Sequence, residues 1–334
     1  MSVQPLAADL IGARIVPSEL FGGVLARRTR RGFSSVAFRL KKNEGASAGV
    51  RRIAREEIDK AIELLDDRGE APAETVHELR KRLKKMRAVL RLVRDELGND
   101  VFHRENRLLR DLGRKLSTAR DAAVRVSALD QLRKKRGRDL SPEDVTPLRK
   151  RLVARRRAAV RRVRNGATLP GFARELRGMR RRVRAWPLSK PGFACLEAGL
   201  RRSYRDGKRS EAQAYAMQTD EAFHEWRKRA KDLRYHVELL VPAWPEVMED
   251  VERELHHLTD RLGDDHDLAD LRRTLKGSQR LARSSRHPDR LFEGIAKRRS
   301  ELQADARPMG ARIYAEKPKV FSARMADYWD AWRS

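Results

Sequence analysis

The segment VHELRKRLKKMRAVLR, which begins at Val76, combines basic side chains at helical spacing with an apolar stripe. At about 100° per residue, the apolar side chains collect on one side of a helix, and they are Leu79, Leu83, Met86, Leu90, Val93 and Leu97. The other side carries His77, Arg80, Lys81, Lys84 and Arg91, with Arg87 at the border. Arginine binds oxyanions through bidentate contacts, and lysine binds them as a mobile point charge. The pattern therefore predicts a helix, anchored by its apolar stripe, that presents a row of cations to an anion.

The same arrangement recurs farther along the chain at a constant offset. An offset of 147 positions takes the first row to a second one, formed by His224, Arg227, Lys228, Lys231 and Arg234. Beyond each row, LGRKLSTARDAAV at 112–124 aligns with LTDRLGDDHDLAD at 258–270 at an offset of 146. Such a repeat is far longer than the roughly 20–50 residues of a solenoid unit, so it predicts two similar helical bundles related by a pseudo-two-fold axis.

The first row extends about 21 Å from His77 to Arg91, which suits a linear ligand with charges at regular intervals. The alternative is a solvated helix face, on which acidic and basic side chains pair at i,i+4. Glu78 with Arg82 and Glu225 with Arg229 have that spacing, but both pairs lie off the rows. Since uncompensated like charges destabilise a helix, we favour a bound anion over a solvated face.

Composition points to the same kind of partner. The chain of 334 residues has 77 Lys and Arg against 48 Asp and Glu, which gives a net charge of +29. Such an excess predicts a polyanionic partner, with nucleic acid, an anionic membrane and inorganic polyphosphate all open. The single cysteine, Cys195, excludes an intramolecular disulfide framework and a zinc site built from cysteines. Without an apolar run of roughly 18 residues, we expect a cytoplasmic protein that does not enter a membrane.

The apolar period is helical along almost the whole chain, which predicts an all-α fold. We expect a basic, partly disordered arm over 1–45, a first helical half over 46–186 and a second over 187–334. Helices are predicted at 47–68, 73–97, 101–136 with a weak point near Ser117, 146–165 and 170–186. The second series is 193–216, 219–240, 246–282 with a break near Gly263, 288–306 and 318–333.

The segments VHELRKRLKKMR and FHEWRKRAKDLRYHVELL, followed by RD and HD pairs, resemble the CHAD domain, the conserved-histidine α-helical domain. This resemblance implies two four-helix bundles that bind inorganic polyphosphate in a basic channel or groove, and a location at polyphosphate granules. Both rows of cations would bind the ligand. LRRSYRDGKRS resembles the basic opening of the family's second half and adds Arg201, Tyr204, Lys208 and Arg209 as contacts.

Other kinds of activity have weaker support in the sequence. The rows carry no interleaved aromatic residues for base stacking, which disfavours nucleic acid as the partner. A phosphohistidine enzyme would use His77 or His224, but no general acid is evident nearby. Both histidines are expected in the first turn of their helices, where free backbone N–H groups favour an anion. Metal-ligand types occur at 256–267, yet the matching segment of the first copy lacks them. We therefore expect a binding protein with no catalytic residues, no metal and no cofactor.

Overall fold

The computed structural model describes residues 38–66, 72–137, 140–165 and 168–334. Residues 1–37, most of the predicted arm, lie outside the described residues. Phe38–Ser334 forms one compact unit, whose described residues make α-helices and no strand, so the all-α prediction is confirmed. None of the described helices is long and apolar enough to cross a membrane.

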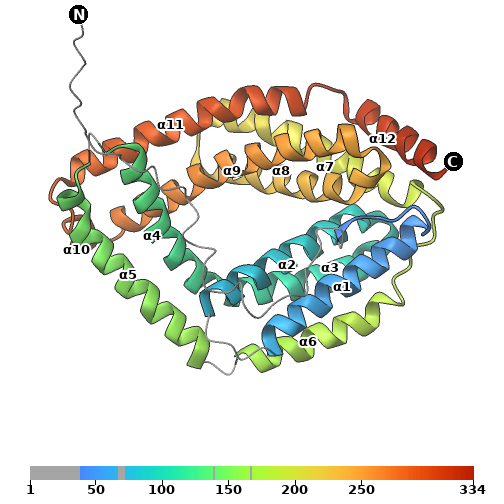
Figure 1. Cartoon of the computed structure of the whole chain (residues 1–334), viewed down its shortest axis with the longest axis horizontal. Helices are drawn as coiled ribbons and strands as arrows, with labels where there is room; N and C mark the ends of the chain where they lie inside the picture. The colour runs from blue at the N-terminus through green and yellow to red at the C-terminus, as the bar shows by residue number, and fades with distance from the viewer. Residues whose placement is uncertain (1–37, 67–71, 138–139, 166–167) are drawn as a thin grey trace, which may run out of the picture. The chain divides into compact units, whose positions relative to one another are not determined.

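The helices follow one another with short connections (Figure 1). The first half contains α1 (Ala46–Asp66), α2 (Pro72–Leu92), α3 (Arg94–Lys115), α4 (Ser117–Lys135), α5 (Pro142–Asn165) and α6 (Thr168–Val183). The second half contains α7 (Ala194–Met217), α8 (Asp220–Leu240), the short 3₁₀ helix η2 (Val241–Ala243), α9 (Pro245–Lys276), α10 (Gln279–Ala282), α11 (Pro288–Ile313) and α12 (Pro318–Arg333).

Corresponding helices of the two copies pack in corresponding pairs. The contacts α1–α2, α2–α3, α4–α5 and α1–α6 in the first copy are matched by α7–α8, α8–α9, α9–α11 and α7–α12 in the second. This repetition of packing is consistent with an internal duplication.

The buried apolar side chains form two main clusters, and each cluster draws on both copies. The larger lies among α1, α2, α3, α6, α7, α8, α12, the first half of α9 and the C-terminal part of α11. The smaller lies among α4, α5, α10, α11 and the second half of α9. Because the copies share their cores, a division into two separate four-helix bundles stays a prediction.

The predicted apolar stripes are the faces that these helices bury. All six stripe residues of the first copy are at most 3 % exposed, and their counterparts Trp226, Ala230, Leu233, Val237 and Leu240 are at most 2 % exposed. Gly98, which has φ 71°, ends the first stripe with a kink inside α3. Glycine is the residue that adopts this left-handed conformation without steric cost.

Two predicted interruptions of the helices have different outcomes. The weak point near Ser117 is confirmed, because α3 ends at Lys115 and α4 begins at Ser117. The break near Gly263 is wrong, because α9 runs without interruption from Pro245 to Lys276. A glycine inside a helix costs only about 1 kcal/mol relative to alanine, which the long apolar face of α9 offsets.

Candidate polyanion-binding site

The two predicted rows of cations meet where α2 packs against α8. Burial lowers the pKa of Lys84 well below its usual value, and the nearby charges of Lys231 and Arg227 lower it further. Burial, followed by the charge of Arg227, lowers the pKa of Lys231 to about 8. Neither ammonium group forms a hydrogen bond or an ion pair with any residue that the structure describes. The two copies therefore bring together buried ammonium groups that have no direct acidic partner, although the charge of Asp260 partly opposes the lowering of the pKa of Lys231.

Arg80 and Arg87 flank Lys84 on α2 and are held by neutral groups. The Nη1 of Arg80 donates to the carbonyl of Gly113 at 2.5 Å, and the Nε of Arg87 donates to Oδ1 of Asn106 at 3.0 Å. Burial lowers the pKa of Arg87 to about 10. These bonds orient the two guanidinium groups without neutralising them.

A pocket of about 200 Å³ opens between α2 and α3 beside these arginines. Its lining consists of five cations and four uncharged residues: Arg80, Lys84, Arg87, Arg110, Arg114, Leu83, Leu109, Gly113 and Ser117. Asp111, which pairs with Arg110 at 3.1 Å and with Arg114 at 3.8 Å, is not part of the lining. The interior of this pocket is suited to an anion.

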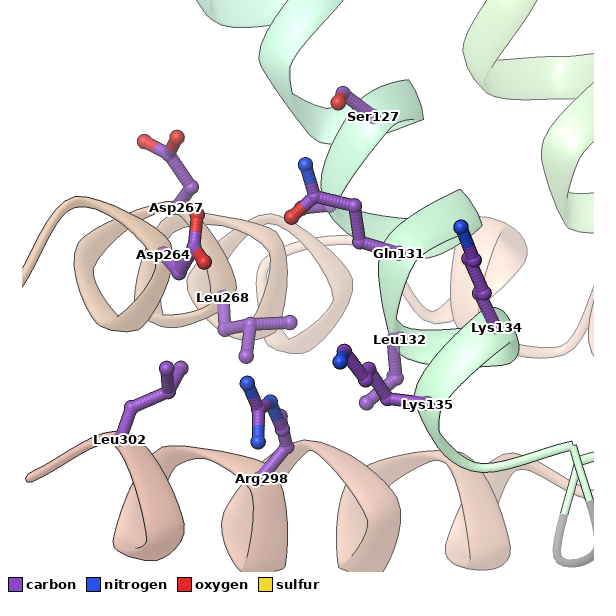
Figure 2. A pocket seen from close by; sticks show the side chains of 11 residues that line it. Ser127, Gln131, Leu132, Lys134, Lys135, Asp264, Asp267, Leu268, Arg298 and Leu302 are labelled. Carbon is purple, nitrogen blue, oxygen red and sulfur yellow. The ribbon is translucent and has the colours of Figure 1, made fainter. Parts of the chain in front are cut away.

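A pocket of about 260 Å³ between α4, α9 and α11 has a different character (Figure 2). Asp264 and Asp267 on α9 line one side of it, while Lys134, Lys135 and Arg298 line the other. Because both signs of charge face its interior, it is less suited to a polyanion.

On the second copy, Arg227 lies against α9. A Cβ atom on Gly263 would come within 3.6 Å of its Nε, and that Nε is buried without a hydrogen bond. Gly263, which the sequence suggested as a helix break, instead lies inside α9 beside this arginine. Arg234, farther along α8, donates from Nε to Oε1 of Glu252 at 2.7 Å.

Arg120 on α4 is a further member of the site that the sequence prediction missed. Its charge contributes to lowering the pKa of Arg80, Lys84 and Lys231. Its guanidinium lies 3.5 Å from Asp267. The offset of 146 pairs Arg120 with His266. Because the two residues differ in type, the comparison of the two copies did not identify Arg120 as a site residue.

The histidines of the two rows, His77 and His224, have unlike surroundings. The Nδ1 atoms of His224 and His266 are 3.1 Å apart, and their rings stack with centroids 4.2 Å apart. Burial is the main cause that lowers the pKa of His224 to about 4 and that of His266 to about 3. Both rings are therefore neutral near pH 7, with one Nδ1 donating to the other. His77 is exposed and has no such partner.

The expectation that these histidines lie in the first turn is wrong. Since α2 begins at Pro72 and α8 at Asp220, His77 and His224 lie in the second turn. The backbone N–H groups that lack intrahelical partners belong to the first four residues of a helix, so they are not those of the histidines.

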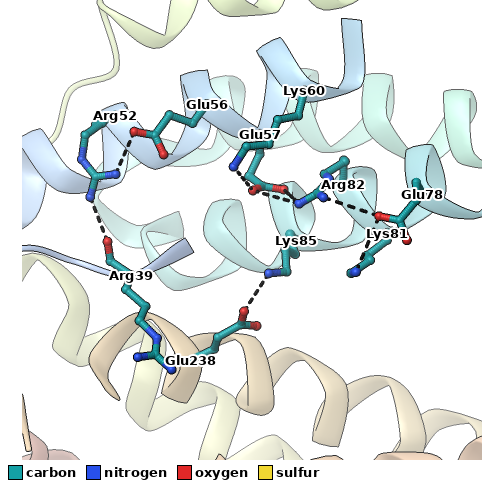
Figure 3. A network of polar contacts seen from close by, with 10 residues as sticks. All are labelled: Arg39, Arg52, Glu56, Glu57, Lys60, Glu78, Lys81, Arg82, Lys85 and Glu238. Atoms are coloured by element: carbon teal, nitrogen blue, oxygen red, sulfur yellow. Dashed lines mark hydrogen bonds and ion pairs between the residues drawn. The ribbon is translucent and has the colours of Figure 1, made fainter. Parts of the chain in front are cut away.

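Several predicted binding residues already have acidic partners, and Figure 3 shows one of them, Lys81. Lys81 pairs with Glu78 at 3.6 Å, and Glu78 also pairs with Arg82. Lys228 donates to Glu225 at 2.5 Å. Four predicted cations have acidic partners, in the pairs Lys81–Glu78, Lys228–Glu225, Arg91–Asp232 and Arg234–Glu252. On α2 and α8, the predicted cations without a direct acidic partner among the described residues are thus Arg80, Lys84, Arg87, Arg227 and Lys231.

One of the four predicted contacts on α7, Tyr204, needs correction. Tyr204 is 0 % exposed and donates its hydroxyl proton to the carbonyl of Ile313 at 3.0 Å, so it is a core residue and we leave it out of the site. Lys208 donates to the carbonyl of Glu316 at 3.0 Å, where it supports the connection between α11 and α12. Arg201 and Arg209 are exposed on α7.

Among the described residues, no three histidine, cysteine or acidic side chains are placed to hold a metal ion. Asp265, in the segment with metal-ligand residue types, is 2 % exposed. It accepts hydrogen bonds from Arg299 at 2.8 Å and from Gln303 at 3.0 Å. Its role in the structure is therefore an internal ion pair.

Comparison with known proteins agrees with this geometry. A comparison with curated proteins found no match. A profile of the CHAD domain matches residues 50–276, more than half of the 334-residue chain. The matched region extends from α1 to the end of α9 and includes both rows of cations, Arg120 and the histidine pair. The chain belongs to the CHAD domain family.

Proposed function

We propose that the protein binds long-chain inorganic polyphosphate, without transforming it, across the basic surface that α2, α8 and Arg120 form. The observation that carries this proposal is the pair Lys84 and Lys231. These ammonium groups come from the two copies, share a buried environment with Arg227, and lack acidic partners among the described residues. Burying unpaired charge is unfavourable, so a ligand that supplies closely spaced oxyanions stabilises the arrangement.

Nucleic acid is the rival ligand, because a net charge of +29 attracts any polyanion through counter-ion release. Single-stranded nucleic acid is bound mainly by stacking bases on exposed aromatic rings. Tyr235, whose ring centroid lies 6.0 Å from the Nζ of Lys231, is only 4 % exposed. The site therefore offers charge without a stacking platform, which favours polyphosphate.

The enzymatic alternative requires a histidine that accepts a phosphoryl group and a neighbouring general acid. His224 and His266 are directed at each other, and cations surround them. We therefore propose a binding role for the protein, and a location at polyphosphate granules follows from that role.

Competition and charge reversal test the proposal. Labelled long-chain polyphosphate should resist displacement by excess duplex DNA or RNA at equal phosphate concentration and moderate salt. Lys84→Glu with Lys231→Glu should weaken binding at least about tenfold, equivalent to about 1.4 kcal/mol, and should lower the salt slope. Arg174→Glu with Arg181→Glu, on exposed positions of α6, is the matched control. Equal losses in both double variants would indicate diffuse attraction and contradict a defined site.

A phosphate-release assay tests the enzymatic alternative. Purified protein with Mg²⁺ or Mn²⁺ should release no orthophosphate from polyphosphate. Steady release that His224→Ala abolishes would replace the binding role with a phosphatase or phosphotransferase activity.

A further inference from the structure

The two copies differ in charge at the helix that faces each row. The offset of 146 between α3 and α9 pairs Asn106 with Glu252, Arg110 with His256 and Arg114 with Asp260. At each of these positions the first copy is the more positive one. The duplication has therefore kept the rows on α2 and α8 but has altered what lies opposite them.

The contacts show the effect of the first of these differences. Arg87 and Arg234 are counterparts, and each donates from Nε to the counterpart position on the next helix. In the first copy the acceptor is the neutral amide of Asn106, whereas in the second it is the carboxylate of Glu252. Arg87 thus keeps its charge available to a ligand, while Arg234 is neutralised within the protein.

The other two differences act in the same direction. Arg110 and Arg114 line the pocket between α2 and α3. Their counterparts, His256 and Asp260, interact with each other instead, with Nδ1 of the histidine 3.4 Å from the carboxylate. The charge of Asp260 also reaches Lys231, where it opposes the lowering of that pKa.

We infer that the two halves of the site are unequal: the α2–α3 pocket is the primary phosphate subsite, and it binds a short linear polyphosphate on its own at a single position on the protein. This inference rests on the proposed function, because it takes inorganic polyphosphate as the ligand. The pocket has five cations and no carboxylate in its lining, whereas the counterpart surface on α8 and α9 carries Glu252 and Asp260. A volume of about 200 Å³ is far above the roughly 10–15 Å³ that one water molecule needs, which leaves room for linked phosphate groups.

Tripolyphosphate is the probe, and calorimetric titration of the full chain is the measurement. The wild-type protein should bind one tripolyphosphate. Arg110→Gln with Arg114→Gln should weaken that binding at least about tenfold, equivalent to about 1.4 kcal/mol. Both arginines are exposed, so thermal unfolding should be almost unchanged.

The matched control uses the counterpart positions. His256→Gln with Asp260→Asn should leave the affinity unchanged or raise it slightly, because it removes a carboxylate from the weaker half. A triple variant, Glu252→Asn with His256→Arg and Asp260→Arg, gives the second copy the residues of the first at these positions. It should have a second equivalent site and bind two tripolyphosphate molecules per chain.

The outcomes separate this inference from the proposed function. Two equivalent tripolyphosphate sites in the wild-type protein, or full affinity in the Arg110 and Arg114 double variant, would overturn the inequality of the halves. The same holds if long-chain polyphosphate binds but tripolyphosphate does not, while the proposed function would stand. If neither ligand binds, the proposed function itself fails.

Discussion

Lys84 and Lys231 lie in surroundings that disfavour their protonated, charged form. Burial is the largest cause in both cases, and neighbouring cations add to it. The folded-state pKa of Lys231, about 8, lies below the usual value of 10.5. Protonation of Lys231 therefore lowers the free energy of unfolding of the unliganded protein. This loss is complete below pH 8 and becomes smaller as the pH rises from 8 toward 10.5. A polyanion reverses this preference, because it stabilises the protonated form.

Binding of long-chain polyphosphate should consequently depend on pH. Internal phosphate groups stay ionised throughout, so the titrating groups belong to the protein. For one lysine whose pKa returns to its usual value on binding, affinity should fall about tenfold between pH 7 and pH 9. Lys84→Arg with Lys231→Arg should flatten the profile, because arginine stays charged over this range. An unchanged pH profile in this double variant would show that other groups carry the titration.

The approach of α7 to α2 depends on the absence of a side chain at Gly199. A Cβ atom there would lie 1.7 Å from the carbonyl oxygen of Leu92. Gly199→Ala should therefore force the two helices apart and lower the free energy of unfolding by about 1–3 kcal/mol. Gly171→Ala in α6 is the control, because nothing lies within 4 Å of its added Cβ, and it should stabilise the protein by about 0.5–1 kcal/mol. Urea unfolding measures both, and equal effects would mean that the close approach is not maintained.

The elements were predictable from the sequence because helical periodicity is a local property. The burial of Leu79, Leu83 and Met86 follows from the phase of one helix. The acidic partners of the cations were not predictable to the same degree. Lys81 pairs with Glu78 within its own helix, but Arg91 pairs with Asp232, a partner 141 residues away, so that contact depends on how α2 and α8 cross.

The chemical character of the site was predictable, but its full membership was not. Both rows of cations could be found in the sequence because the two copies have the same residue types at a constant offset. It could not reveal Arg120, whose counterpart is a histidine, or the burial of Tyr204, whose phenol resembles a ligand contact in sequence alone. Both facts depend on distances between helices far apart in the chain.

At the scale of the whole molecule, two ion pairs link the first copy to the second, and in both pairs the first copy supplies the cation. Lys85 pairs with Glu238 at 2.7 Å, and Arg91 pairs with Asp232 at 2.9 Å. Under the offset of 147, Lys85 corresponds to Asp232 and Arg91 to Glu238. The two pairs therefore occupy exchanged positions, as in an interface with two-fold symmetry, but the first copy supplies both cations and the second both carboxylates.

Reversing one member of such a pair should be costly, and reversing both should restore it. Lys85→Glu places two carboxylates together in a largely buried setting and should lower the free energy of unfolding by about 3–5 kcal/mol. Lys85→Glu with Glu238→Lys should recover most of that loss. Arg149→Glu, at the exposed pair with Asp130, should cost no more than about 1 kcal/mol. If the double reversal is as unstable as the single one, complementarity of charge does not hold the copies together.

Helix α9 has a consequence for how the protein loses its structure. Its 32 residues extend about 48 Å and contribute Leu255, Leu258 and Leu262 to the larger core and Leu268, Leu271 and Leu275 to the smaller. Neither core can open fully without breaking backbone hydrogen bonds of the helix on which the other core rests. We therefore expect the amides in the middle of α9 to be among the last to exchange with solvent, and the two cores to unfold as a single cooperative unit.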